Sequence, residues 1–126
     1  MLISTGSKEL LLYTRIKVYK ERCFARVLST QEAVAEAVRL GFEGKHLIAM
    51  QGPYSEELNL AMLKHINAAY FVTKESGGAG GFEEKKKAAQ KAGAELIVIA
   101  RPKEEGKSLQ EVKKLMEEFL AKENLL

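Results

Sequence analysis

The chain has no aspartate and only one cysteine, and these two shortages exclude several kinds of site. All 17 acidic side chains are glutamates, so sites that need an aspartate nucleophile or an aspartate of the Walker-B type are excluded. A single cysteine, Cys23, cannot form an internal disulfide, and with His46 and His65 far apart in the sequence it offers no metal cluster. We therefore predict no metal site, and we expect Cys23 to be a buried core residue in a reducing, cytoplasmic setting.

Long apolar runs are also missing. The uncharged stretches are much shorter than the roughly 20 residues that a membrane helix needs, so we expect a soluble protein. A chain of 126 residues fits one domain with an ordinary core. The 20 basic and 17 acidic side chains are well mixed, whereas nucleic-acid binders usually gather their positive charge on one face. We expect neither a membrane nor a nucleic acid as partner.

Short apolar segments alternate with amphipathic ones along the whole chain. We expect strands at residues 2–4, 22–28, 46–50, 70–74 and 95–100. We expect helices at residues 9–13, at 33–40 after a capping box at 29–32, from residue 56 onward, at 83–91, and after a second capping box at 108–111. The alternation predicts a single Rossmann-like (flavodoxin-like) α/β domain over residues 1–126, with three layers and a mainly parallel sheet. The almost wholly apolar last strand predicts helices on both of its faces.

Residues 70–101 are the most informative stretch, because they predict a strand, a glycine-rich loop, a helix and a second strand in succession. The loop contains Lys74, Ser76 and four glycines. Glycine lets backbone N–H groups approach a ligand closely, and the start of the following helix adds unpaired donors and partial positive charge. This order favours anion binding. The loop matches neither G-x-G-x-x-G nor a Walker pattern, so a mobile loop without a ligand is the alternative.

The loops that follow parallel strands lie at one edge of the sheet, where α/β proteins bind their ligands. In this chain those loops bring hydroxyls, glycine amides and cations together, which predicts an anionic ligand. Lys85, in the first turn of a helix, is placed to reach it, whereas Lys86 and Lys87 should be solvated. Each element also has a structural interpretation, for example Ser55 as a helix N-cap.

Four motifs together resemble a known family. They are Ser-Thr-Gly-Ser-Lys at 4–8, Gly-Pro-Tyr-Ser-Glu-Glu-Leu-Asn at 52–59, Thr-Lys-Glu-Ser-Gly-Gly-Ala-Gly-Gly at 73–81 and Ala-Arg-Pro at 100–102. The chain resembles the precorrin-6A (cobalt-precorrin-6A) reductases of cobalamin biosynthesis over nearly all its length, but only their C-terminal half. The resemblance implies two Rossmann-like domains with the active site between them, so we expect the natural polypeptide to extend upstream.

The resemblance implies that NADPH or NADH reduces one double bond of a corrin precursor, a carboxylated tetrapyrrole, to give precorrin-6B. The N-terminal half of the enzyme would be a partner, and the isolated domain would be inactive and prone to form a homodimer. The family's motifs place substrate- or cofactor-binding residues at Ser7, Gly52, Pro53, Ser55, Asn59, Lys74, Ser76, Gly77, Gly78, Gly80, Gly81, Lys85 and Arg101.

Lys74 is the favoured polar participant, as an electrostatic anchor. The resemblance does not identify the catalytic residue. Members of the family commonly have two consecutive arginines before the proline. This chain has Ala100 in place of the first arginine, which weakens the expected contact from Arg101. A different class of function stays open beside the reductase. The chain lacks an evident acid, base or nucleophile, which favours a non-catalytic α/β module that binds a nucleotide or another anion.

Overall fold

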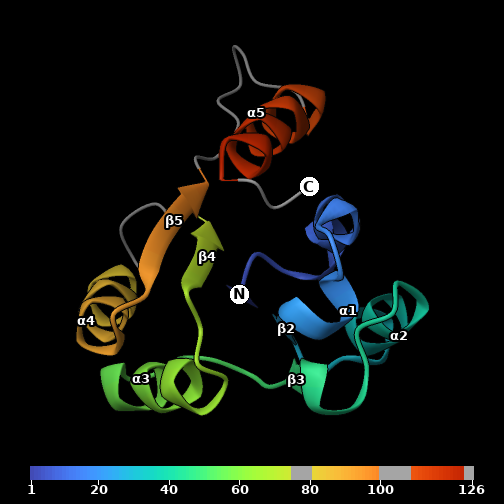
Figure 1. Cartoon of the computed structure of the whole chain (residues 1–126). Coiled ribbons are helices and arrows are strands. Elements are labelled where there is room, and N and C mark those ends of the chain that lie inside the picture. The colour runs from blue at the N-terminus through green and yellow to red at the C-terminus, as the bar shows by residue number, and fades with distance from the viewer. Residues whose placement is uncertain (75–80, 100–108, 124–126) are drawn as a thin grey trace.

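The computed structural model describes residues 1–74, 81–99 and 109–123, and it forms a parallel sheet with helices on both faces (Figure 1). The strands are β1 (Leu2–Ile3), β2 (Phe24–Val27), β3 (Leu47–Ala49), β4 (Tyr70–Lys74) and β5 (Glu95–Ile99). Their order in the sheet is β3-β2-β1-β4-β5, and every neighbouring pair is parallel. This is the Rossmann order, in which β1 is central, rather than the flavodoxin order. The predicted fold class is confirmed.

Helices occupy two layers. They are η1 (Ser7–Arg15, a 3₁₀ helix), α1 (Tyr19–Arg22), α2 (Gln31–Arg39), η2 (Gly44–His46, also 3₁₀), α3 (Glu56–His65), α4 (Phe82–Ala92) and α5 (Leu109–Lys122). One core cluster joins one face of the sheet to η1, α2 and α5, and the other joins the opposite face to α3 and α4. The connections from β1 and from β4 therefore leave on opposite faces.

The two faces of the central strands follow the alternation of a β-strand. Leu2 and Ile3 are neighbours in β1, yet Leu2 packs with Leu63 and Phe71 in one cluster, while Ile3 packs with Val72 in the other. Burial of the strands on both faces explains why they are so apolar. Cys23 is buried and reduced, as predicted.

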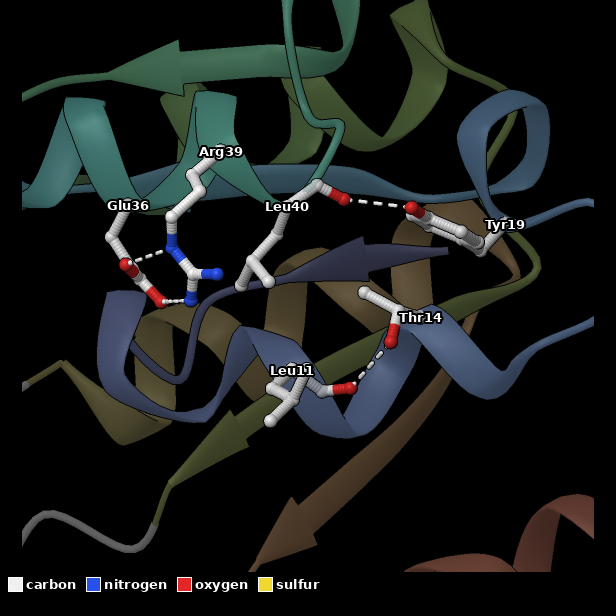
Figure 2. Close-up of polar contacts among 6 residues, drawn as sticks. All are labelled: Leu11, Thr14, Tyr19, Glu36, Arg39 and Leu40. Atoms are coloured by element: carbon white, nitrogen blue, oxygen red, sulfur yellow. Dashed lines mark hydrogen bonds and ion pairs between the residues drawn. The ribbon is translucent and has the colours of Figure 1, made fainter.

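Figure 2 shows polar contacts in the layer that contains η1, α1 and α2: one lies within η1, one within α2, and one joins α1 to the end of α2. The Tyr19 hydroxyl donates to the Leu40 carbonyl at 2.7 Å, which links α1 to the end of α2. Gly41, the predicted terminator of α2, has φ +99°, and a Cβ at this position would lie 2.9 Å from the Tyr19 hydroxyl oxygen. Glycine is therefore required both by the backbone conformation and by this close approach.

Three expectations need correction. The N-cap of α2 is Thr30, whose hydroxyl accepts a hydrogen bond from the Ala33 amide at 3.2 Å, so the interpretation of Ser29 as the capping residue is wrong. The segment 22–28 does not begin as a strand, because α1 ends at Arg22. The last strand, β5, lies at the edge of the sheet with Val98 41% exposed, so helices do not cover it fully on both faces.

Other predicted boundaries hold closely. α3 begins after Ser55, α4 ends at Gly93, and β4 matches the expected range. The second capping box, at 108–111, begins outside the described residues. Within the part of the chain that the structure describes, no helix is both long enough and apolar enough to cross a membrane.

Candidate anion-binding site at the carboxyl edge of the sheet

The strand order places a topological switch point between β1 and β4. β1 continues into η1 on one face and β4 is followed by α4 on the other, so the two connections diverge where the strands end. In open α/β sheets this topological switch point is where ligands bind. The Ser4 amide still donates to the Val72 carbonyl at 2.9 Å, and the chains separate beyond that bond.

Thr5, Gly6 and Ser7 follow β1 at the switch point. Gly6 has φ +95°, and no heavy atom of the described residues lies within 4 Å of the place where its Cβ would be. Ser7 is the first residue of η1. The buried hydroxyls of Thr5 and Tyr13 lie near each other, and neither has a hydrogen-bond partner at normal distance among the described residues.

Lys74, at the end of β4, pairs with a side chain from the helix that follows β1. Its Nζ lies 2.7 Å from Oε1 of Glu9, which comes from η1. The sequence predicted Lys74 as an available cation, but it did not reveal this partner. The ion pair balances the charge of Lys74 and leaves Glu9 Oε2 buried without a hydrogen bond from the described residues. An arriving anion would therefore compete with Glu9 for Lys74.

Lys85 reaches the same edge from α4, as predicted. Its Nζ donates a hydrogen bond to Thr73 Oγ1 at 2.8 Å, and Thr73 is buried near the end of β4. Burial lowers the pKa of Lys85 below its ordinary value, and repulsion from Arg26 lowers it further. The amine is thus a partly desolvated cation next to another cation, an environment that an anion would relieve.

Arg26 is a further cation at this edge, and it was not among the residues predicted from the sequence. It is only 3% exposed, and its Nη1 donates to Asn59 Oδ1 at 2.7 Å. Burial lowers the pKa of its guanidinium to about 10, and nearby Tyr54 partly offsets that effect. The available signal was the alternation of β2: Arg26 shares a face with Phe24, on a strand whose two faces are both covered.

The Gly52–Pro53 turn places an aromatic ring over Arg26. Its peptide bond is cis, and a Cβ on Gly52 would lie 3.1 Å from the Tyr54 ring. The Tyr54 hydroxyl donates to the Met50 carbonyl at 2.7 Å, and the ring centroid lies 3.7 Å from Arg26 Cζ. This stacking is a cation–π contact. The absence of a side chain on Gly52 therefore lets Tyr54 fold back over the guanidinium.

The residues carried over from the family motifs have different positions in the structure. Lys74 pairs with Glu9, and Lys85 donates to Thr73. Asn59 accepts a hydrogen bond from Arg26, and Gly52 lies against the Tyr54 ring. Ser55 is the N-cap of α3, accepting from the Leu58 amide at 3.1 Å, and Gly81 precedes α4 with φ +75°. Pro53 is exposed beside Tyr54. Ser76, Gly77, Gly78, Gly80 and Arg101 lie outside the described residues.

This edge of the sheet suits an oxyanion better than a metal ion. Among residues 1–74, 81–99 and 109–123, no three His, Cys, Asp or Glu side chains gather to hold a metal. The same part of the chain shows no carboxylate within ion-pair distance of Arg26 or Lys85. Two cations, a glycine backbone and unpaired donors can bind phosphate or carboxylate oxygens.

Comparison with known proteins identifies the family. The family model described as precorrin-6x reductase CbiJ/CobK matches residues 1–119. The chain belongs to the precorrin-6x reductase family. This membership confirms the resemblance drawn from the four sequence motifs, and it assigns the chain to an oxidoreductase family of cobalamin biosynthesis.

Curated members of the precorrin-6x reductase family align with most of this chain but with less than half of their own length. The cobalt-precorrin-6A reductase of Priestia megaterium is 36% identical over 105 residues, covering 82% of this chain and 41% of the relative. That of Salmonella typhimurium is 37% identical over 102 residues, covering 81% and 38%. That of Methanothermobacter thermautotrophicus is 40% identical over 82 residues, covering 65% and 27%. No solved structure matches the chain significantly.

Proposed function

We propose that this chain is the C-terminal domain of a precorrin-6A or cobalt-precorrin-6A reductase that uses NADPH or NADH. The reaction would reduce one double bond of the macrocycle and give precorrin-6B, in the cytoplasm. Support comes from the family match over residues 1–119 and from relatives that are named cobalt-precorrin-6A reductase and of which the chain covers 41% or less. The remaining part of such an enzyme would be the partner of this domain.

The observation that carries the proposal is the set of polar groups at the switch point. The backbone of Gly6, the Lys74–Glu9 pair and the partly buried amine of Lys85 suit the oxyanions of both reactants, phosphates on the cofactor and carboxylates on the tetrapyrrole. When bound, the nicotinamide supplies the hydride. The residues of this chain would bind and orient the reactants, with Lys74 as an electrostatic anchor.

The other half of the active site would come from the partner domain. Several large apolar side chains are exposed among the described residues, including Leu28 after β2, Met50 after β3, Leu11 on η1 and Phe82 on α4. Exposed apolar side chains suit contact with another domain. We therefore propose that the isolated domain binds ligands without turnover and self-associates through some of these side chains.

The test is calorimetric titration of the chain with NADPH and with NADH, at low and moderate salt, for the wild type and for Lys74→Ala. The control is Lys86→Ala, which removes the same charge from an exposed position on α4. We expect salt-sensitive binding that weakens about tenfold in Lys74→Ala and changes little in the control. Equal binding by the three proteins would contradict the role of Lys74. Absence of nucleotide binding would remove the cofactor from this domain.

A further inference from the structure

Two buried N–H groups at the carboxyl edge have no acceptor among the described residues. They are Nη2 of Arg26 and Nδ2 of Asn59. Arg26 is 3% exposed and Asn59 is fully buried. Leaving a buried donor unpaired is unfavourable, and more so for a charged one, so native proteins rarely keep such groups without a water, an ion or a ligand.

The two unpaired donors flank a single hydrogen bond. Arg26 Nη1 donates to Asn59 Oδ1 at 2.7 Å, and this bond settles the orientation of the amide, because Nη1 can only donate. Nη2 shares the carbon Cζ with Nη1, and Nδ2 shares the carbon Cγ with Oδ1. Both donors therefore lie next to the same bond, one charged and one neutral.

The charge around this pair is uncompensated. No described carboxylate forms an ion pair with Arg26, and repulsion from its charge contributes to the lowered pKa of Lys85. Phe71 lies below the guanidinium, with its centroid 5.5 Å from Cζ. A water molecule would accept hydrogen bonds here but would leave the buried positive charge unbalanced. An oxyanion would accept the hydrogen bonds and also balance the charge.

The Tyr54 ring stacks on the guanidinium of Arg26, and Tyr54 is partly exposed in the turn that follows β3. One hydrogen bond to the Met50 carbonyl and the stacking contact hold the ring in this position. An oxyanion that reaches Arg26 from the turn after β3 would have to displace this ring.

We propose that Arg26 and Asn59 form a subsite for one oxyanion, a carboxylate or a phosphate, which enters beneath Tyr54 and has Lys85 as a second countercharge. The subsite adds a residue, Arg26, that the family motifs did not mark. It rests on the proposed function only for the source of the oxyanion, which is either the tetrapyrrole or the nucleotide cofactor. The existence of the subsite depends on the two unpaired donors alone.

The decisive variant is Asn59→Asp, which keeps the size of the side chain and gives Arg26 an internal carboxylate. The control is Asn67→Asp, the same change at the other end of α3, where Asn67 has φ +51°, a conformation that aspartate tolerates. Inorganic phosphate, NADPH and a carboxylated porphyrin are titrated into each protein. We expect Asn59→Asp to bind at least one of them tenfold or more weakly than wild type, and the control to change less than twofold.

A second readout separates ligand binding from a structural role. The guanidinium ¹⁵N resonance of Arg26 should shift on saturation with the ligand that the variant loses, and it should not shift in Asn59→Asp. Equal binding in wild type and Asn59→Asp, or an Arg26 resonance that stays unchanged at saturation, would overturn the proposal and leave an internal water as the occupant. If Asn59→Asp does not fold, Arg26→Gln compared with Arg39→Gln, the same change at an exposed position on α2, decides by the same tenfold criterion.

The three titrations also identify the source of the oxyanion, and they separate the subsite proposal from the proposed reductase function. A loss confined to NADPH identifies the cofactor phosphate, and a loss confined to the porphyrin identifies a substrate carboxylate. If wild type binds phosphate through Arg26 but neither organic ligand, the subsite stands and the proposed reductase function fails for this domain. If both organic ligands bind equally to wild type and to Asn59→Asp, the function stands and the subsite is overturned.

Discussion

The two ends of the central strands bury different kinds of side chain. Near the amino ends the buried residues are apolar, including Cys23 before β2 and Ala68 before β4. The four buried polar residues among the described part of the chain are Thr5, Arg26, Asn59 and Thr73, and they lie at or beside the carboxyl ends. One sheet thus has an end that contributes stability and an end that retains polar groups at a cost in stability.

The hydrogen bonding of these polar groups is more informative than their burial. Several of the polar groups at the carboxyl ends have no hydrogen-bond partner within the described residues, among them Thr5, Glu9, Arg26 and Asn59. Unpaired buried groups destabilise a fold, so they concentrate where function requires them. This contrast locates the candidate site without reference to any motif.

The largest effect should come from the apolar end. Leu63 is 1% exposed and packs with Leu2 and Phe71. Leu63→Ala should lower the free energy of unfolding by about 2–5 kcal/mol, because it removes buried methyl groups and leaves a cavity. Urea denaturation monitored by circular dichroism measures the change. A loss below about 1 kcal/mol would show that this end of α3 is not a tightly packed core.

The opposite sign is expected at the carboxyl end. The double variant Arg26→Met, Asn59→Leu replaces a buried cation and its amide partner by apolar side chains of similar size. We expect the free energy of unfolding to rise by about 1–4 kcal/mol, as for other buried polar groups replaced by packed apolar ones. Oxyanion binding should fall at the same time. Denaturation and phosphate titration on one preparation measure both, and a destabilised double variant would contradict the comparison.

A satisfied polar group at the same end should behave differently from the unpaired ones. Thr30 caps α2, so Thr30→Ala should cost about 1 kcal/mol of stability, because the Ala33 amide loses its acceptor. The matched control is Ser29→Ala, which should change stability by less than about 0.5 kcal/mol. Thermal or urea denaturation of both variants gives the comparison. The reverse ranking would restore Ser29 as the cap.

The smallest effect at neutral pH is expected at Cys23. Burial raises the pKa of its thiol to about 11, whereas in the unfolded chain a thiol ionises near its ordinary value of about 8.5. Stability should therefore be constant below the unfolded value and should fall as the pH rises through the interval up to about 11. Alkylation of the native protein at pH 8 should be about a hundredfold slower or more than that of the urea-unfolded chain, as measured by mass spectrometry. Comparable rates would show that the amino end opens readily.

Local signals predicted most of the elements but not all of their details. Ser55 before the glutamates of α3 and Gly93 after α4 act within one helical turn, so their roles follow from neighbouring residues. The capping box failed at Ser29 because Thr30, the next residue, is an equally good cap. The helix α1 was missed because four residues give too little periodicity.

The candidate site was predicted only in part for a related reason. The edge of the sheet and the residues Gly52, Asn59, Lys74 and Lys85 followed from motifs and from the rule that ligands bind at the carboxyl ends of parallel strands. Arg26 was not selected, because one arginine in a strand of four residues is a weak local signal, and its position on the same face as Phe24 indicates burial only once both faces of β2 are known to be covered. The Lys74–Glu9 pair joins groups 65 residues apart in the sequence, and no local pattern connects them.

The sequence by itself determined the class of fold and predicted the edge where we propose that a ligand binds, because hydrophobic periodicity and glycine-rich turns act over a few residues. The tertiary structure alone decided the strand order, the countercharge of Lys74 and the burial of Arg26 against Asn59. These depend on which elements pack side by side, and packing joins residues that are distant in the chain. Such contacts set the charge and desolvation of the site, and therefore its chemistry.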